Sequence, residues 1–194
     1  MADTLRAFIA FKLPDPVVLF IRELQADLKN RPELRLKWVR PESVHLTLKF
    51  LGNIRPDAVA PIAGAMAETA AAWPPLSLSA RGLGAFPTPK KARVVWLGLT
   101  GDTHSLIELQ KDLDARLAPL GFPRETRPFK AHLTMGRAKG KVDPQSLVEA
   151  ITAGAESASP AFPADRLILF KSDLKPDGAV HTPLREAPLT GRTD

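Results

Sequence analysis

Arg-Pro-Glu-Ser-Val-His-Leu-Thr-Leu, at residues 40–48, is repeated later in the chain as Arg-Pro-Phe-Lys-Ala-His-Leu-Thr-Met, at residues 127–135. Five of the nine positions are identical, and the last position is apolar in both copies. One histidine-threonine pair on a strand is common in proteins, but a duplicated pair indicates a functional constellation. The repeat predicts two lobes of similar build that present one histidine and one threonine each to a shared cleft.

The duplication extends beyond the motif. Arg6 precedes His45 by the same interval that separates Arg93 from His132, and each arginine opens an apolar stretch. Periodicity and turn signals then predict a similar order of strands and helices in both halves of the chain. Strands are expected at 6–13, 44–51, 76–82, 92–100, 131–136, 165–173 and 179–186, and helices at 15–30, 56–72, 103–120 and 144–155. Pro176-Asp177-Gly178 is a turn sequence that would join the last two strands.

These elements predict an α+β fold with a pseudo-two-fold duplication. Two mainly antiparallel sheets would face a central cleft, with the helices on the outside. We expect one domain over residues 1–194, made of lobes at about 1–85 and 90–194, with exchange of strands between the lobes left open. The proline-rich stretch 86–89 is the candidate hinge between them.

Alternation along a strand places His45 and Thr47 on one face, and likewise His132 and Thr134. Two imidazoles with ordinary pKa values near 6.5 suit general acid and base catalysis close to neutrality. Threonine hydroxyls, and Arg137 just after the second motif, can bind phosphoryl oxygens. We therefore expect catalysis by the two histidines at a phosphodiester, with phosphate binding by Thr47, Thr134 and Arg137 and with neither a metal nor a cofactor.

Other residues are weaker candidates. Phe11, Phe50 and Phe129 are expected in the core, and any of them that reaches the cleft mouth would stack on a base. His104 is expected at the surface, and a structural role is expected for His181.

Composition narrows the class of protein. The chain has 194 residues, 44% of them hydrophobic and 25% charged, as in ordinary globular proteins. The absence of cysteine excludes disulfides, thiolate catalysis and cysteine-ligated zinc. The apolar stretch at 7–11 is too short for a signal peptide, and no run approaches the roughly 18 residues of a membrane span. We expect a cytoplasmic protein that does not bind membranes, and its net charge of +6 favours a polyanionic ligand such as RNA.

With these motifs the chain resembles the 2H phosphoesterase superfamily, and within it the RNA 2′,3′-cyclic phosphodiesterases, also called 2′-5′ RNA ligases. The similar stretches are 6–14, 38–52, 84–87, 94–98, 129–137 and 171–178. The resemblance implies metal-independent hydrolysis of a terminal RNA 2′,3′-cyclic phosphate to a 2′-phosphate, with 2′-5′ ligation as the reverse reaction. It implies that His45 protonates the leaving 3′ oxygen and that His132 activates water.

The resemblance also implies an RNA partner, with ends derived from tRNA as one candidate, and a monomer without an obligate protein partner. Family members often carry tyrosine after the glycine of the last hairpin, whereas this chain has His181. Three other readings stay open at this point. In the first, the cleft acts on a small cyclic phosphate, such as a cyclic nucleotide or an ADP-ribose cyclic phosphate. In the second, it binds RNA ends without turnover. In the third, the two histidines hold a metal ion.

Overall fold

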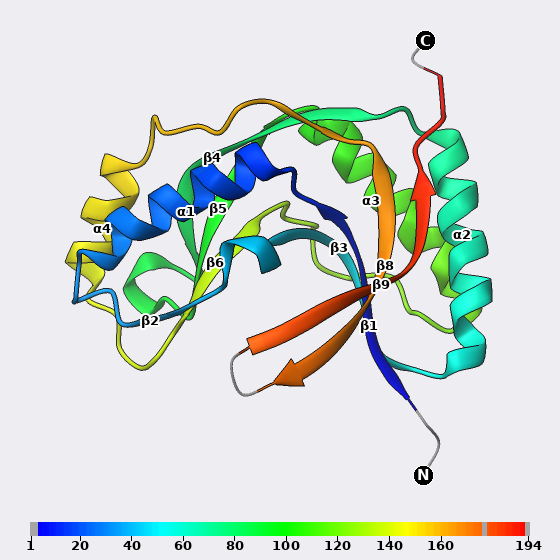
Figure 1. Cartoon of the computed structure of the whole chain (residues 1–194), viewed down its shortest axis with the longest axis horizontal. Coiled ribbons are helices and arrows are strands. Elements are labelled where there is room, and N and C mark those ends of the chain that lie inside the picture. Colours follow the sequence, from blue (N-terminus) through cyan, green and yellow to red (C-terminus); the bar gives the residue numbers. More distant parts are fainter. Residues whose placement is uncertain (1–3, 176–177, 193–194) are drawn as a thin grey trace.

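The computed structural model describes residues 4–175 and 178–192, and the strands of this part form one nine-stranded sheet (Figure 1). Every strand pair in it is antiparallel. The strands are β1 (Leu5–Lys12), β2 (Leu36–Trp38), β3 (His45–Ile54), β4 (Leu76–Phe86), β5 (Val94–Gly101), β6 (Leu133–Ala138), β7 (Phe162–Ala164), β8 (Arg166–Lys175) and β9 (Gly178–Pro188). Their order is β7-β4-β5-β6-β3-β1-β8-β9, and β2 pairs with β6 outside this path.

Four α-helices and four short 3₁₀ segments complete the described chain. The helices are α1 (Asp15–Lys29), α2 (Val59–Ala72), α3 (Thr103–Leu117) and α4 (Pro144–Ala153), and the 3₁₀ segments are η1 (Pro41–Ser43), η2 (Pro56–Ala58), η3 (Pro89–Lys91) and η4 (Ala118–Leu120). The predicted mixed fold, with helices outside antiparallel strands, is confirmed. The expected turn at 176–177 lies outside the described residues.

The sheet consists of two halves that do not follow the two halves of the sequence. One half contains β1, β3, β8 and β9, and the other contains β2, β4, β5, β6 and β7. The expected lobe boundaries, 1–85 and 90–194, therefore do not match the halves of the sheet, because strands are exchanged between the halves. The stretch 86–89 is also not a hinge between lobes, since it joins β4 to its direct neighbour β5.

The helices cross over as well. Helix α1 follows β1 but packs on the other half, where Gln25 donates hydrogen bonds to the carbonyls of Val39 at 2.8 Å and Met135 at 3.2 Å. Helix α3 follows β5 but packs against β3, where Lys49 contacts Asp114. Figure 1 shows α1 and α4 beside β4, β5 and β6, with α2 and α3 on the far side of the molecule beside β8 and β9.

The main core lies between the sheet and the helices. Helix α1 contributes Val17, Ile21 and Leu28, whose spacing places them on one face, and all three are buried. Burying such a side chain is worth roughly 1.5–3 kcal/mol. A second, smaller cluster consists of Phe8, Ala10, Ile168 and Phe170. Phe8 and Ala10 alternate along β1 with residues of the main core, so this cluster covers the opposite face of the sheet.

Within the described residues, no helix is long and apolar enough to cross a membrane.

Candidate active site

The two copies of the motif meet where the halves of the sheet join. Among the described residues one pair, Leu46 with Leu133, links β3 to β6. Both leucines are fully buried in the main core. The two expected sheets are thus continuous through this pair, because each half contributes its motif strand to the junction.

This pairing sets the positions of the four motif side chains. Antiparallel neighbours run in opposite directions, so His45 lies beside Thr134, and Thr47 lies beside His132. Side chains on either side of a buried residue point to the other face of the sheet. The structure therefore brings the two predicted histidines and the two predicted threonines together on one face, in two crossed pairs. His132 itself comes one residue before β6, which begins at Leu133 rather than at 131 as expected.

Both imidazole rings are held in the same way. His45 Nδ1 lies 2.8 Å from the carbonyl oxygen of Ser43, and His132 Nδ1 lies 2.7 Å from that of Lys130. A carbonyl only accepts hydrogen bonds, so each Nδ1 carries the proton and donates it. In the neutral ring Nε2 is then free to accept a proton, and in the charged ring it can donate one.

A β-bulge determines the direction of Arg137. In the pairing with β5, Thr134 lies opposite Trp96 and Arg137 lies opposite Val94, which leaves Met135 as an extra residue. Trp96 and Val94 share one face of β5, so Thr134 and Arg137 also share one face. Without the bulge, alternation would turn Arg137 to the opposite side. The structure thus places Arg137 on the face of the site because of the bulge, whereas alternation alone would have turned it away; its role in phosphate binding stays a prediction.

The first motif contains the equivalent bulge. In the pairing with β1, Thr47 lies opposite Ala10 and Phe50 lies opposite Phe8, with Leu48 as the extra residue. Phe50 therefore faces the same side as Thr47. It is 64% exposed, which is uncommon for so large an apolar side chain.

Different aromatic groups surround the two histidines. The ring of His45 stacks on Phe8, with 4.5 Å between centroids and 25° between planes. The ring of His132 meets Phe86 edge to face at 5.0 Å and lies 6.4 Å from Trp96. These contacts fix the orientation of both rings at the surface of the sheet.

Burial determines the charge state of His45. Burial lowers the pKa of His45 from 6.5 to about 4, although its hydrogen bond to the Ser43 carbonyl raises it. The charges of His181 and His132 contribute smaller parts of the same lowering. His45 without a bound anion is therefore neutral at physiological pH.

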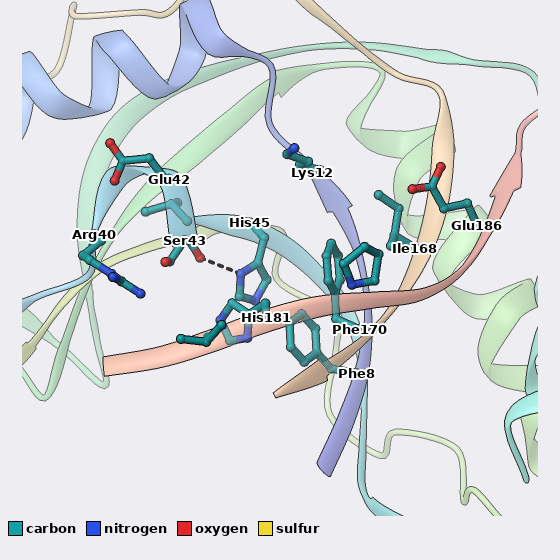
Figure 2. Close-up of a pocket in the computed structure, with 13 residues that line it drawn as sticks. Phe8, Lys12, Arg40, Glu42, Ser43, His45, Ile168, Phe170, His181 and Glu186 are labelled. Atoms are coloured by element: carbon teal, nitrogen blue, oxygen red, sulfur yellow. Dashed lines mark hydrogen bonds between the residues drawn. The ribbon is translucent and has the colours of Figure 1, made fainter. Parts of the chain in front are cut away.

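A pocket of about 300 Å³ opens beside His45, between η1 and strands β1, β8 and β9. Phe8, Arg40, Ser43, His45, Phe170 and His181 are among its lining residues. Figure 2 shows His181 next to His45, with Phe8 and Phe170 close by and Arg40 on the far side of His45. The ring of His181 lies 5.1 Å from that of His45, at 85°. His181 was expected to be structural, but it lies beside the site. The sequence gives no sign of this, because His181 belongs to a hairpin far from His45 along the chain.

The three expected stacking residues differ in position. Phe11 is 1% exposed and belongs to the main core, as expected, so it does not reach the cleft mouth and is excluded as a stacking residue. It alternates with Phe8 and Ala10 along β1 and therefore points to the helices. Phe129 is half-buried against the main core, and its stacking role stays a prediction. Phe50 is exposed on the face of the site, so its expected place in the core is wrong, and its stacking role stays a prediction.

Within the described chain no group of three or more histidine, cysteine, aspartate or glutamate residues has the arrangement of a metal site. The expectation of catalysis without a metal stays a prediction. His104 lies in the first turn of α3 and is exposed, as expected.

Comparison with known families gives two matches along the chain. A family model described as LigT-like phosphoesterase matches residues 12–96 and again residues 98–181. Each match contains one copy of the histidine motif, in agreement with the duplication.

Curated relatives are similar over nearly the whole length. An RNA 2′,3′-cyclic phosphodiesterase of Methanothermobacter thermautotrophicus is 33% identical over 177 residues, which cover 91% of this chain and 95% of the relative. One of Thermus thermophilus is 32% identical and covers 96% of this chain and 91% of the relative.

Solved structures share the fold. The crystal structure of TT0787 from Thermus thermophilus has a TM-score of 0.78 and 28% identity, and covers 97% of this chain and 100% of that chain. Escherichia coli LigT complexed with 3′-AMP has a TM-score of 0.75 and 24% identity, and covers 97% and 99%.

Proposed function

The chain belongs to the LigT-like phosphoesterase family, and we propose that it hydrolyses the 2′,3′-cyclic phosphate at the end of an RNA to a 2′-phosphate. The observation that carries the proposal is the crossed arrangement of two His-x-Thr pairs around Leu46 and Leu133. It places two imidazoles with free Nε2 atoms on one face, as acid and base catalysis at a single phosphorus requires. The names of the curated relatives support the substrate.

His132 acts as the general base. It takes a proton from water on Nε2, and the water oxygen forms a bond to phosphorus. The bond from phosphorus to the 3′ oxygen breaks, and His45 gives its Nε2 proton to that oxygen. The 2′ oxygen keeps the phosphate. The family resemblance suggests this division of roles. Ligation would use a 5′-hydroxyl in place of water: His132 would take its proton, the 5′ oxygen would bond to phosphorus, and His45 would protonate the departing 3′ oxygen, which leaves a 2′-5′ phosphodiester.

His45 must be protonated to act as the acid, yet its low pKa keeps it neutral before substrate binds. The cyclic phosphate carries a negative charge, and an opposite charge within a few ångströms raises the pKa of an imidazole. Substrate binding therefore brings the proton to His45. This coupling makes the acid available when a phosphate is in place.

Thr47, Thr134 and Arg137 bind the non-bridging oxygens. The threonine hydroxyls flank the histidines, and the bulge at Met135 turns the guanidinium to the same face. Hydrogen bonds from these donors stabilise the charge that develops on the phosphoryl group in the transition state. They carry no proton that is transferred.

Phe50 supports a base on the opposite side from Arg137. It lies next to Phe8, with 6.2 Å between ring centroids, and is the exposed member of that pair. Stacking on an aromatic ring accepts every base. The terminal nucleoside would then lie on the His45 side, where its 3′ oxygen receives the proton.

The test is hydrolysis of an oligoribonucleotide that ends in a 2′,3′-cyclic phosphate, in the presence of EDTA. We expect a 2′-phosphate product from the wild-type protein and a rate about 10²–10⁴-fold lower from His45→Ala or His132→Ala, with the circular dichroism of both variants unchanged. A 3′-phosphate product, or undiminished turnover by either variant, would contradict the proposal. Loss of activity in EDTA that a divalent ion restores would support a metal site instead.

A further inference from the structure

The pocket beside His45 contains polar groups that the proposed reaction does not use. Arg40 and His181 line it, and neither belongs to the four motif residues at the junction. No described residue of β6 lines this pocket, so it extends away from His132. The pseudo-two-fold symmetry of the site is broken here, since the corresponding surroundings of His132 are the rings of Phe86 and Trp96.

The charged residues of the pocket that are not in salt bridges within the described chain are positive. Two glutamates also line it, but Glu42 is paired with Arg22 and Glu186 with Arg166. Lys12 and Arg40 have no carboxylate partner among the salt bridges of the described residues, which leaves their positive charges available to a ligand. The guanidinium of Arg40 donates one hydrogen bond, from Nη2 to the carbonyl of Ala179 at 3.3 Å, which holds it against the β9 strand.

His181 adds a polar group that the fold leaves unsatisfied. Its Nδ1 atom is buried and has no hydrogen-bond partner among the described residues. A buried N–H without a partner is rarer than a buried acceptor without one, so the neutral ring keeps its proton on Nε2. Burial and the charges of Arg40 and Arg6 lower the pKa of His181 and keep the ring neutral. The Nε2–H of His181 and the guanidinium of Arg40 are therefore two neighbouring hydrogen-bond donors, which suit a phosphate oxygen.

The direction of the pocket indicates which part of a substrate would occupy it. In the proposed reaction His45 protonates the 3′ oxygen, so the terminal ribose lies on the His45 side of the reacting phosphorus. In an RNA chain the same ribose carries, on its 5′ oxygen, the phosphodiester that links it to the preceding nucleotide. A single nucleoside cyclic phosphate lacks this group.

We propose that Arg40 and His181 form a second anion site, which binds the phosphodiester on the 5′ side of the terminal nucleotide. This inference rests on the proposed function and deepens it, because it identifies the substrate class as an RNA chain rather than a single cyclic nucleotide. Arg40 supplies the charge, and His181 supplies a neutral donor while its ring packs against Phe8 at 4.9 Å.

The test compares kcat/KM for a nucleoside 2′,3′-cyclic phosphate and for a dinucleotide with the same terminal cyclic phosphate. We expect the wild-type protein to prefer the dinucleotide. Arg40→Gln should reduce this preference about tenfold, the size expected for the loss of one charge-assisted hydrogen bond. Arg40→Lys, which keeps the charge, should retain most of it. His181→Phe keeps the ring and removes the donor, so it should reduce the preference as well.

Arg55→Gln is the matched control. Arg55 pairs with Asp57 just after β3 ends, and His45 is at the other end of that strand. Arg55→Gln changes the net charge by the same amount as Arg40→Gln. It should leave the preference unchanged. Equal losses on both substrates in Arg40→Gln, or no preference in the wild-type protein, would overturn the inference while the proposed function stands. A wild-type protein that hydrolyses neither substrate would refute both.

Discussion

Phe50 and Arg137 occupy equivalent positions, two residues after each copy of the motif, and each is turned to the site by a bulge two residues earlier. The duplicated backbone thus places an aromatic ring on one side of the site and a cation on the other side. A symmetric site would bind a symmetric ligand, whereas a terminal nucleotide has a base at one end and a phosphate at the other. The difference between these two side chains gives the site a direction.

Phe50→Ala should lower kcat/KM for an RNA cyclic phosphate by roughly tenfold, since a stacked base is worth about 1–3 kcal/mol. Phe50→Trp should keep the activity, because it keeps a flat ring. Phe50 is exposed, so the melting temperature should hardly change. Leu19→Ala, at an exposed leucine on α1, is the control for loss of apolar surface. Full activity in Phe50→Ala would exclude the stacking role.

Gly84→Ala should disturb the His132 side of the site. A Cβ atom at this position would lie 2.2 Å from Cζ2 of Trp96, and Trp96 packs near His132. We expect a loss of about 1–3 kcal/mol in the free energy of unfolding and a lower kcat. Gly64→Ala serves as the control, because a Cβ there has no neighbour within 4 Å. Urea unfolding and initial rates measure both effects, and unchanged rates in Gly84→Ala would show that the position of Trp96 is unimportant.

The low pKa of His45 should make stability depend on pH. The unfolded chain binds a proton below about 6.5, whereas the native ring binds one only near 4. The free energy of unfolding should therefore fall as the pH drops from 6.5 towards 4, by about 3 kcal/mol in total. His45→Gln should reduce this dependence, and His181 should account for part of what remains, since its pKa is also lowered. Identical pH dependence in the variant and the wild type would contradict the buried neutral state of His45.

A buried ion pair anchors the segment that leads to the second motif. Lys49 Nζ lies 2.5 Å from Asp114 Oδ1 and donates to the carbonyl of Pro123 at 2.6 Å, and Asp114 accepts from the backbone N–H of Glu125 at 2.7 Å. Lys49→Met should cost about 3–5 kcal/mol in the free energy of unfolding, because it leaves a buried carboxylate without its partner. The double variant Lys49→Met/Asp114→Leu should lose less than the sum of the single changes. A double-mutant cycle in urea measures this, and additive losses would show that the two groups are not coupled.

Much of the site could be predicted from the sequence because it is duplicated. Alternation along a strand brought His45 and Thr47 to one face, and the repeat showed that His132 and Thr134 would do the same. Alternation failed at the two bulges, which turn Phe50 and Arg137 to the face of the site. Phe11 was considered for stacking, yet counting from the motif says nothing about β1, where it points into the core.

The features that the sequence did not predict depend mostly on contacts between residues far apart in the chain. No glycine or proline lies at the first bulge, and Gly136 beside the second is not among the glycines with a positive φ, so the orientation of Arg137 is evident only from its pairing with β5. Strands β2 and β7 have three residues each and are too short for a periodic pattern. The proximity of His181 to His45 arises because β8 and β9 pair with the β1 half of the sheet, and local sequence does not encode that exchange of strands.

The division of roles between the two histidines is tested most directly by changing the leaving group. The rates of His45→Ala and His132→Ala would be measured on an RNA cyclic phosphate and on a nitrophenyl phosphodiester, whose leaving oxygen needs no proton. Both variants should lose about 10²–10⁴-fold on the RNA substrate. On the nitrophenyl substrate His45→Ala should recover much of the rate, and His132→Ala should not. An equal response of the two variants, or recovery by His132→Ala alone, would contradict the assignment of His45 as the acid and His132 as the base.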